Sequence, residues 1–419
     1  MRLGSRYGWS LVVATLCTYP IASGSGAHAD QWIHTAPTRS NLRTVAIGPF
    51  EERIFMQPNA GGARRGTAEP RALLPWFAAT TGPGCKDPWW MVGASAWVCS
   101  TDVTLSDLPS VAAEAEHELS ADGLPFRYYK VGLTGARAYR QLLDTSDGKV
   151  AAELEPGFIV GISRIARFED QDFGLSSKGT WLALEELTPM GIPRFQGTSV
   201  NGDLAQIAWV RRERIDLWST PSGRRVGSEK RRALLHVGET KTQQGRQWLR
   251  VSDTAWVRAE DVQRPPLTTP PADLLPQERW IDVDLATQTL TAYQGAQAVF
   301  TTLVSTGKGA ANTPLSTPPG QYRIWVKLRT SDMTNLEDED AQRYYAIQDV
   351  PWVMYFEAGY GLHGAFWHSS FGEVRSHGCV NLAPRDAERL FYWASPRVPA
   401  GWSAVLPTSH DLGTRVVIH

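Results

Sequence analysis

A fifteen-residue pattern occurs twice in this 419-residue chain and limits its fold more than any other feature. Residues 89–103 read WWMVGASAWVCSTDV, and residues 248–262 read WLRVSDTAWVRAEDV. Both copies begin with Trp, carry Val at the fourth position, reach Trp-Val eight residues after the start and end in Asp-Val. So many shared positions indicate a duplicated structural unit, and a weaker third copy surrounds residues 180–187.

Short apolar runs precede both clear copies. Residues 54–58 and 215–221 each form such a run and contain a Pro, which interrupts a strand. Gly-rich turns and a further apolar run follow each of them. We therefore expect a mainly β fold, with small β-rich units at residues 44–107 and 205–264 and, from the weaker copy, at 127–190.

A Pro-rich segment over residues 265–276 marks a boundary, because such segments are extended and stiff. Beyond it, residues 277–407 are predicted to form a second β-rich domain with one or two short helices. Alternating runs at 279–285 and 288–293 predict strands. Pro384 favours the first turn of a helix, and the ten residues from Pro384 onward suit one.

The N-terminus has the pattern of an export signal over residues 1–29. Arg2 and Arg6 precede a short apolar run, and residues 27–29 read AHA, a small-x-small cleavage site. Cys17 leaves a lipoprotein as an alternative. No later stretch reaches 18 apolar residues, so we expect no transmembrane segment in the mature chain. The prediction is an exported protein of the periplasm or cell envelope.

The composition of the chain indicates which kinds of binding partner to expect. The formal net charge of -1 gives no indication of nucleic acid or of an anionic membrane surface. The chain contains 17 Trp, which suit either the aromatic cores of small β units or grooves that bind sugars or peptides.

The cysteine count points to one thiol. Cleavage of the signal removes Cys17 and leaves three Cys, an odd number that suggests one pair and one free thiol in an oxidising compartment. Cys85 and Cys99 lie 14 residues apart within one predicted unit. A disulfide between them would contribute about 3 kcal/mol in the chain-entropy model. Cys379 then remains unpaired.

The unpaired thiol lies in the densest cluster of reactive side chains. His363, His368 and His377 fall within 15 positions and end beside Cys379. Attack on an amide requires a thiolate, a base and donors for the oxyanion, which this cluster can supply. Gly378 permits a tight turn directly before the thiol. The N-terminus of the predicted helix that follows would lower the pKa of Cys379 if it points at the thiol.

The cluster closely resembles the signature of the L,D-transpeptidase catalytic domain family, also called YkuD. That signature is a His, a spacer of about a dozen residues, Ser/Thr-His-Gly-Cys, an aliphatic residue and Arg or Asn. Here twelve residues separate His363 from residues 376–381, which read SHGCVN. The resemblance covers residues 277–407. The N-terminal units resemble bacterial SH3-like modules, on the less specific signal of Trp-Val at a strand end.

The resemblance implies a role for each residue. Cys379 would attack the third residue of a peptidoglycan stem tetrapeptide, His363 would act as its base, and His377 would stand beside the oxyanion. A neighbouring stem would then resolve the thioester into a 3→3 cross-link, without a cofactor or metal. The main-chain carbonyl of Gly364 would orient the base. The expected substrate contacts are Gly364, Trp367, His368, Ser376, Gly378, Asn381 and Tyr355.

Several alternatives remain open at this point. Water in place of the acceptor amine would give an L,D-carboxypeptidase or endopeptidase. A Cys/His peptidase of the NlpC/P60 or papain kind places the Cys before the His, the reverse of the order here. A wall-binding scaffold would not need an intact Ser-His-Gly-Cys segment, and the His and Cys spacing matches no zinc motif. The SH3-like units would serve either as spacers or as binders of the wall.

Overall fold

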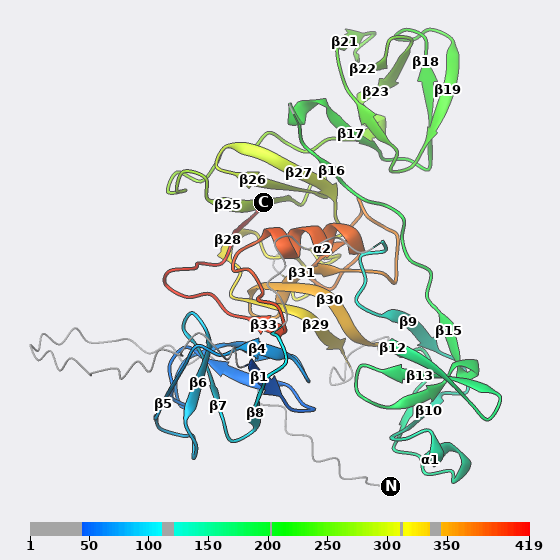
Figure 1. Ribbon diagram of the computed structural model, residues 1–419. Helices are drawn as coiled ribbons and strands as arrows, with labels where there is room; N and C mark the ends of the chain where they lie inside the picture. The colour runs from blue at the N-terminus through cyan, green and yellow to red at the C-terminus, as the bar shows by residue number, and fades with distance from the viewer. Residues whose placement is uncertain (1–43, 111–120, 202, 311–312, 336–344) are drawn as a thin grey trace, which may run out of the picture.

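The computed structural model describes residues 44–110, 121–201, 203–310, 313–335 and 345–419 (Figure 1). The predicted export signal and Cys17 lie outside the described residues. Three small β units precede a larger C-terminal domain. Figure 1 shows the first unit (blue) and the third unit (green) at opposite ends of the molecule, with the C-terminal domain between them.

The first unit is built from eight short strands. β1 pairs with β4 and β8, β2 pairs with β3 and β7, and β6 pairs with β5 and β7. Val45, Ile54, Leu74 and Val98 are fully buried between these strands and form its core. The strands are β1 (Thr44–Ile47), β2 (Glu52–Phe55), β3 (Arg64–Ala68), β4 (Leu73–Pro75), β5 (Ala78–Thr80), β6 (Trp89–Gly93), β7 (Ala96–Cys99) and β8 (Val103–Ser106).

The third unit repeats these pairings strand for strand. β17 pairs with β20 and β24, β18 with β19 and β23, and β22 with β21 and β23. The strands are β17 (Ile207–Val210), β18 (Arg214–Trp218), β19 (Arg225–Lys230), β20 (Leu234–His236), β21 (Thr240–Gln243), β22 (Arg246–Ser252), β23 (Ala255–Arg258) and β24 (Val262–Gln263).

The second unit has the same scheme of strand pairings, except that its long strand β12 takes the place of two separate strands of the other units. β12 pairs with β9 through its first half and with β13 through most of its length. β9 also pairs with β15, and β14 pairs with β10 and β13. The elements are β9 (Arg127–Val131), β10 (Ala136–Tyr139), α1 (Leu143–Ser146), β11 (Ala152–Leu154), β12 (Ile159–Phe168), β13 (Gln171–Ser176), β14 (Trp181–Ala183) and β15 (Leu187–Pro189).

The duplicated sequence pattern forms the same hairpin twice. Trp89 opposes Cys99 in the first unit, and Trp248 opposes Arg258 at the equivalent position of the third. Both hairpins shift register at the same point, just before they close. The predicted disulfide between Cys85 and Cys99 is confirmed, with 5.6 Å between the two Cα atoms. The assignment of these units to SH3-like modules stays a prediction.

The C-terminal domain contains two groups of strands around one helix. The first is a six-stranded sheet in the order β16-β27-β26-β25-β34-β28, and the second joins β29 to β30, β31 and β32 in succession. The bounds are β16 (Thr198–Ser199), β25 (Arg279–Asp284), β26 (Thr289–Gln294), β27 (Gln297–Leu303), β28 (Gly320–Arg323), β29 (Val326–Thr334), β30 (Ala346–Glu357), β31 (Tyr360–Gly364), β32 (Val380–Leu382), β33 (Trp402–Val405) and β34 (Arg415–Ile418).

The predicted helix is confirmed as α2 (Pro384–Trp393), with Pro384 in its first turn. Leu390 and Phe391 of α2 pack against buried residues of both strand groups, among them Ile281 and Met354. The mainly β expectation is also confirmed. β34 lies beyond residue 407, where the sequence places the end of the domain. The polar run at 408–414 looks like a terminal segment, yet after it the chain returns to the sheet and pairs with β25.

The first unit is joined to the C-terminal domain by backbone pairing. β3 pairs with β33, and β33 pairs in turn with β29. Gly66 opposes Val405 in this ladder, and a Cβ at Gly66 would lie 2.4 Å from the carbonyl oxygen of Ala404. Only glycine therefore allows the two strands to approach this closely. Within the described residues, no helix has the length and apolar character needed to cross a membrane.

Candidate active site

The candidate thiol and base come from two neighbouring parallel strands. In the β31–β32 pair, His363 opposes Asn381, and Leu362 opposes Val380. Cys379 directly precedes β32. Because alternate residues of a strand point to the same face, this register places Cys379 on the face of the sheet that carries His363 and Asn381.

His363 is fixed in one tautomer. Its side chain is 2% exposed, and its Nδ1 atom lies 3.1 Å from the carbonyl oxygen of Gly364. A carbonyl oxygen only accepts hydrogen bonds, so Nδ1 carries the proton and Nε2 keeps its lone pair. Burial lowers the pKa of His363 to about 4, and the bond to Gly364 opposes this shift. The imidazole is therefore neutral near pH 7, as a general base must be.

Cys379 is a free, partly exposed thiol. Its Sγ atom lies 3.7 Å from the carbonyl oxygen of Gly359. Burial raises the pKa of the Cys379 thiol, and a backbone hydrogen bond from Gly361 only partly offsets the rise. Loss of water around the sulfur therefore dominates, and the pKa of Cys379 is raised rather than lowered. The resting site thus holds a neutral thiol and a neutral imidazole.

The turn before the thiol is held by two hydroxyl groups. The Oγ atom of Ser376 accepts a hydrogen bond from the Gly378 N–H at 3.1 Å and donates to the Cys379 carbonyl at 2.5 Å. Thr317 donates to the Gly378 carbonyl at 2.7 Å. Gly378 has φ of 123°, and a Cβ there would lie 2.3 Å from the ring of Tyr360. The turn consequently requires glycine at this position.

His377 and two tyrosines lie near the thiol. His377 is exposed and stacks on Tyr345 with 5.6 Å between ring centroids, and burial, with the charge of Lys308, lowers its pKa. Burial raises the pKa values of Tyr345 and Tyr355, and the negative charge of the Cys379 thiolate raises both further. Both phenols therefore lie within electrostatic reach of the sulfur.

Two more aromatic contacts frame this site. Trp325 is 46% exposed and stacks on Tyr355 with 5.9 Å between ring centroids. Trp367 stacks on His363 at 5.8 Å and so packs against the base. Sequence reasoning did not select Trp325, Tyr345 or the hydroxyl of Thr317. These residues lie in segments without a motif, and only the folded chain brings them to the thiol.

His368 and Asn381 form a buried pair, with exposed fractions of 8% and 4%. The Ser370 N–H donates to Nδ1 of His368 at 3.1 Å, so the proton of the neutral ring lies on Nε2. That Nε2 atom is 2.9 Å from the side-chain amide of Asn381. The amide oxygen of Asn381 must therefore face the imidazole to accept this proton. Burial lowers the pKa of His368 to about 4, which keeps the ring neutral.

Side chains of the third unit bind the connection between β31, which carries His363, and β32, which follows Cys379. Gln263 is 9% exposed, and its amide donates to the carbonyls of Gly372 at 2.9 Å and Thr287 at 3.0 Å. Arg232 donates to the Phe371 carbonyl at 3.0 Å, and the neighbouring Arg231 pairs with Glu373. Residues 371–373, a few positions before the thiol, are thus held from outside the C-terminal domain.

The second unit packs on the other side of the same connection. The ring of Tyr128 stacks on Phe366 with 3.9 Å between centroids, and Phe366 meets Trp367 edge to face. The Tyr128 hydroxyl donates to the Asp349 carbonyl at 2.5 Å. A chain of ring contacts therefore runs from Tyr128 to Trp367 and on to His363.

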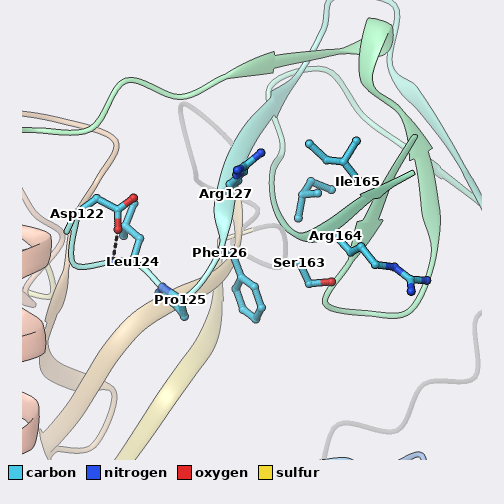
Figure 2. A pocket seen from close by; sticks show the side chains of 9 residues that line it. Asp122, Leu124, Pro125, Phe126, Arg127, Ser163, Arg164 and Ile165 are labelled. Atoms are coloured by element: carbon cyan, nitrogen blue, oxygen red, sulfur yellow. Dashed lines mark hydrogen bonds between the residues drawn. The ribbon is translucent and has the colours of Figure 1, made fainter. Parts of the chain in front are cut away.

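A cavity of about 500 Å³ lies in the second unit, and Figure 2 shows its lining side chains. The segment that leads into β9 forms one wall, with Asp122 and Phe126, and Ser163 to Ile165 of β12 lie across from it. None of the residues predicted for the active site lines this cavity. Among the described residues, no three His, Cys, Asp or Glu side chains gather in a way that would hold a metal ion.

A thiol at the start of one strand and a neutral imidazole on the neighbouring strand, oriented by a main-chain carbonyl, define a Cys/His site in a β-rich domain. Residues 278–418 match the family model of the L,D-transpeptidase catalytic domain, YkuD. The C-terminal third of the chain therefore matches the L,D-transpeptidase catalytic domain, which is a family of cell-wall enzymes. The β-rich region before it has no family assigned.

Solved structures with similarity to the chain carry the same family name. A mutant L,D-transpeptidase from Enterococcus faecium is 22% identical over 34% of this chain and 50% of its own, with a TM-score of 0.26. The L,D-transpeptidase from Stackebrandtia nassauensis is 26% identical over 35% and 57%, with a TM-score of 0.24. The one from Mycobacterium smegmatis is 16% identical over 53% and 82%, with a TM-score of 0.27.

The chain thus spans half the length of the Enterococcus faecium protein that it matches. No curated protein matches the chain.

Proposed function

We propose that the protein is a peptidoglycan L,D-transpeptidase that forms 3→3 cross-links through a cysteinyl acyl-enzyme. One observation carries the proposal: the His363 imidazole is neutral, its Nδ1 proton is committed to the Gly364 carbonyl, and it lies on the strand beside Cys379. A base in that state accepts a proton only at Nε2. The family match supports the choice of peptidoglycan as substrate.

The reaction begins with a neutral pair. Nε2 of His363 takes the thiol proton of Cys379 as the sulfur attacks the carbonyl of the third stem residue. The backbone N–H of Cys379, with His377 beside it, stabilises the oxyanion, since the Gly378 N–H already donates to Ser376. The C–N bond to the terminal D-Ala then breaks, and His363 gives its proton to the leaving amine.

The second half returns the enzyme to its starting state. The side-chain amine of a neighbouring stem attacks the thioester, and His363 accepts the proton that the amine loses. The C–S bond breaks, and the proton passes to the sulfur of Cys379. The raised pKa of Cys379 makes its thiolate a poorer leaving group in this second step. It suits the first step better, in which the thiolate is a nucleophile that forms only when substrate is bound.

The N-terminal region fits the same setting. The three units share one scheme of strand pairings, which supports our proposal that they are tandem SH3-like modules at residues 44–107, 127–190 and 205–264. The export pattern at residues 1–29 supports a periplasmic or envelope location.

The test is mass spectrometry of disaccharide-tetrapeptides incubated with the purified protein. The expected product is a dimer linked between two third residues, with release of D-Ala. Cys379→Ala should form none, and Cys85→Ala with Cys99→Ala, which leaves the candidate thiol intact, is the matched control for loss of a cysteine. Tripeptide without dimer would mean that water is the acceptor. A cross-linking Cys379→Ala variant would refute the proposed nucleophile.

A further inference from the structure

The third unit carries a net positive charge, unlike the chain as a whole. Residues 205–264 contain 13 Lys and Arg against 7 Asp and Glu, a formal charge of +6, whereas the whole chain is at -1. The net charge of the whole chain does not reveal this excess of positive charge, because acidic residues elsewhere in the chain balance it. It is concentrated in the unit that lies at the end of the molecule opposite to the first unit (Figure 1).

The strand register gathers these charges on one face of the sheet β19-β18-β23-β22-β21. Register partners in an antiparallel pair share a face, as do alternate residues of one strand. The opposite face packs the core of the unit, with Ile215, Leu249 and Val257. The outer face carries seven basic side chains and one acidic one, Asp216. The basic residues are Arg214, Arg225, Lys230, Lys241, Arg246, Arg250 and Arg258.

Tryptophan rings hold the basic groups in place. The Arg258 guanidinium lies 5.6 Å from the ring centre of Trp218 and 5.8 Å from that of Trp248. The Lys241 ammonium lies 5.0 Å from the ring centre of Trp256. Such cation–π contacts fix long side chains that would otherwise lose entropy on binding a ligand.

Part of this charge has no acidic neighbour. Arg214 directly opposes Lys230, and like charges in that position destabilise a sheet. Arg214, Lys230 and Arg246 are all exposed, and no carboxylate of the described residues pairs with them. A fold that keeps such repulsion gains from an anionic ligand that relieves it.

We propose that this outer face, which we call the basic face, binds the carboxylate-bearing stem peptides of polymeric peptidoglycan. The choice of polymer rests on the proposed function. Lys230 belongs to the basic face. The next residue, Arg231, pairs with Glu373 in the connection that leads to the thiol. Polymer held on the basic face therefore lies alongside the C-terminal domain that acts on it.

The burial of two of these three tryptophan rings argues against two other kinds of partner, a membrane and a single-stranded nucleic acid. Trp248 and Trp256 are 2% and 6% exposed, so they present no apolar surface for insertion into a membrane. They are likewise closed to the base stacking that single-stranded nucleic acids require. What the basic face offers is an array of cationic heads, two of them held against tryptophan rings, which suits carboxylates spaced along a polymer.

The experiment is co-sedimentation of the full chain with insoluble, protein-free peptidoglycan, in a Cys379→Ala background so that nothing is turned over. The test variant combines Arg214→Glu, Lys230→Glu and Arg246→Glu. The matched control combines Lys86→Glu, Lys130→Glu and Arg140→Glu, which are exposed residues of the first two units with the same change in charge. Circular dichroism checks that both variants are folded.

We expect the test variant to bind about tenfold more weakly or worse, and the control to bind like the parent chain. Binding should weaken with salt and when the polymer's carboxylates are converted to neutral amides. Equal binding by the test variant and the control would overturn the proposal, as would binding only to phosphatidylglycerol vesicles. Cross-linking of soluble stem fragments is assayed separately, so either proposal can fail while the other stands.

Discussion

Removal of the amide of Gln263 should loosen the candidate active site from a position outside its own domain. In Gln263→Ala, the carbonyls of Gly372 and Thr287 lose the donors that now lie 2.9 and 3.0 Å away. Each buried carbonyl left without a partner costs about 1–3 kcal/mol, and water entering the space recovers part of this. We therefore expect about 2 kcal/mol of local destabilisation.

Hydrogen exchange at residues 371–373 measures this directly. The Gly372 N–H donates to the Val304 carbonyl at 2.8 Å, so its exchange reports the opening of this connection. A loss of about 2 kcal/mol corresponds to roughly 30-fold less protection. The rate of acyl-enzyme formation should fall as well, because the same connection leads into the Cys379 turn.

Gln243→Ala is the matched control, since Gln243 is exposed and makes no side-chain hydrogen bond in the described part of the chain. If Gln263→Ala exchanges and acylates like Gln243→Ala, the third unit does not hold the active-site connection and the reasoning is wrong.

Three further outcomes follow from the described contacts. Alkylation of Cys379 by iodoacetamide should rise with pH and reach its midpoint above that of an ordinary thiol, because burial raises its pKa; a midpoint below it would contradict the neutral resting pair. Thr317→Val removes the donor to the Gly378 carbonyl and should slow acylation about tenfold at nearly unchanged KM, whereas Thr317→Ser should keep the rate. Asp386 accepts hydrogen bonds from Gly197 and Thr302, and burial raises its pKa to about 6. Its contribution to stability is therefore complete below the pKa of the unfolded state and is lost as pH rises through 6. Thermal unfolding of Asp386→Asn should lack that pH dependence.

The sequence predicted the parts of the molecule that local pattern determines. The helix at Pro384 follows from one residue that suits a first turn, and the paired Cys85 and Cys99 follow from an odd count of thiols. His363 and Cys379 belong to one motif whose spacing reflects adjacent strands. All three predictions depend on residues close together in the chain.

Other features depend on long-range contacts and left no signal in the sequence. Gln263 meets Gly372 across more than a hundred positions, and a lone Gln after a strand suggests no partner. Thr317 lies in a Gly- and Pro-rich stretch that looks like any loop. The raised pKa of the Cys379 thiol also has no local signal, because the burial of its side chain depends on strands distant in the sequence.

The pairing of β3 with β33 has a consequence for the shortened forms of this protein. A chain without the first unit would leave the N–H and C=O groups of β33 on that side without partners, along an open sheet edge. Such an edge is a template for pairing between molecules. The first unit therefore acts as an internal cover against aggregation, and the C-terminal domain alone should be the less soluble form.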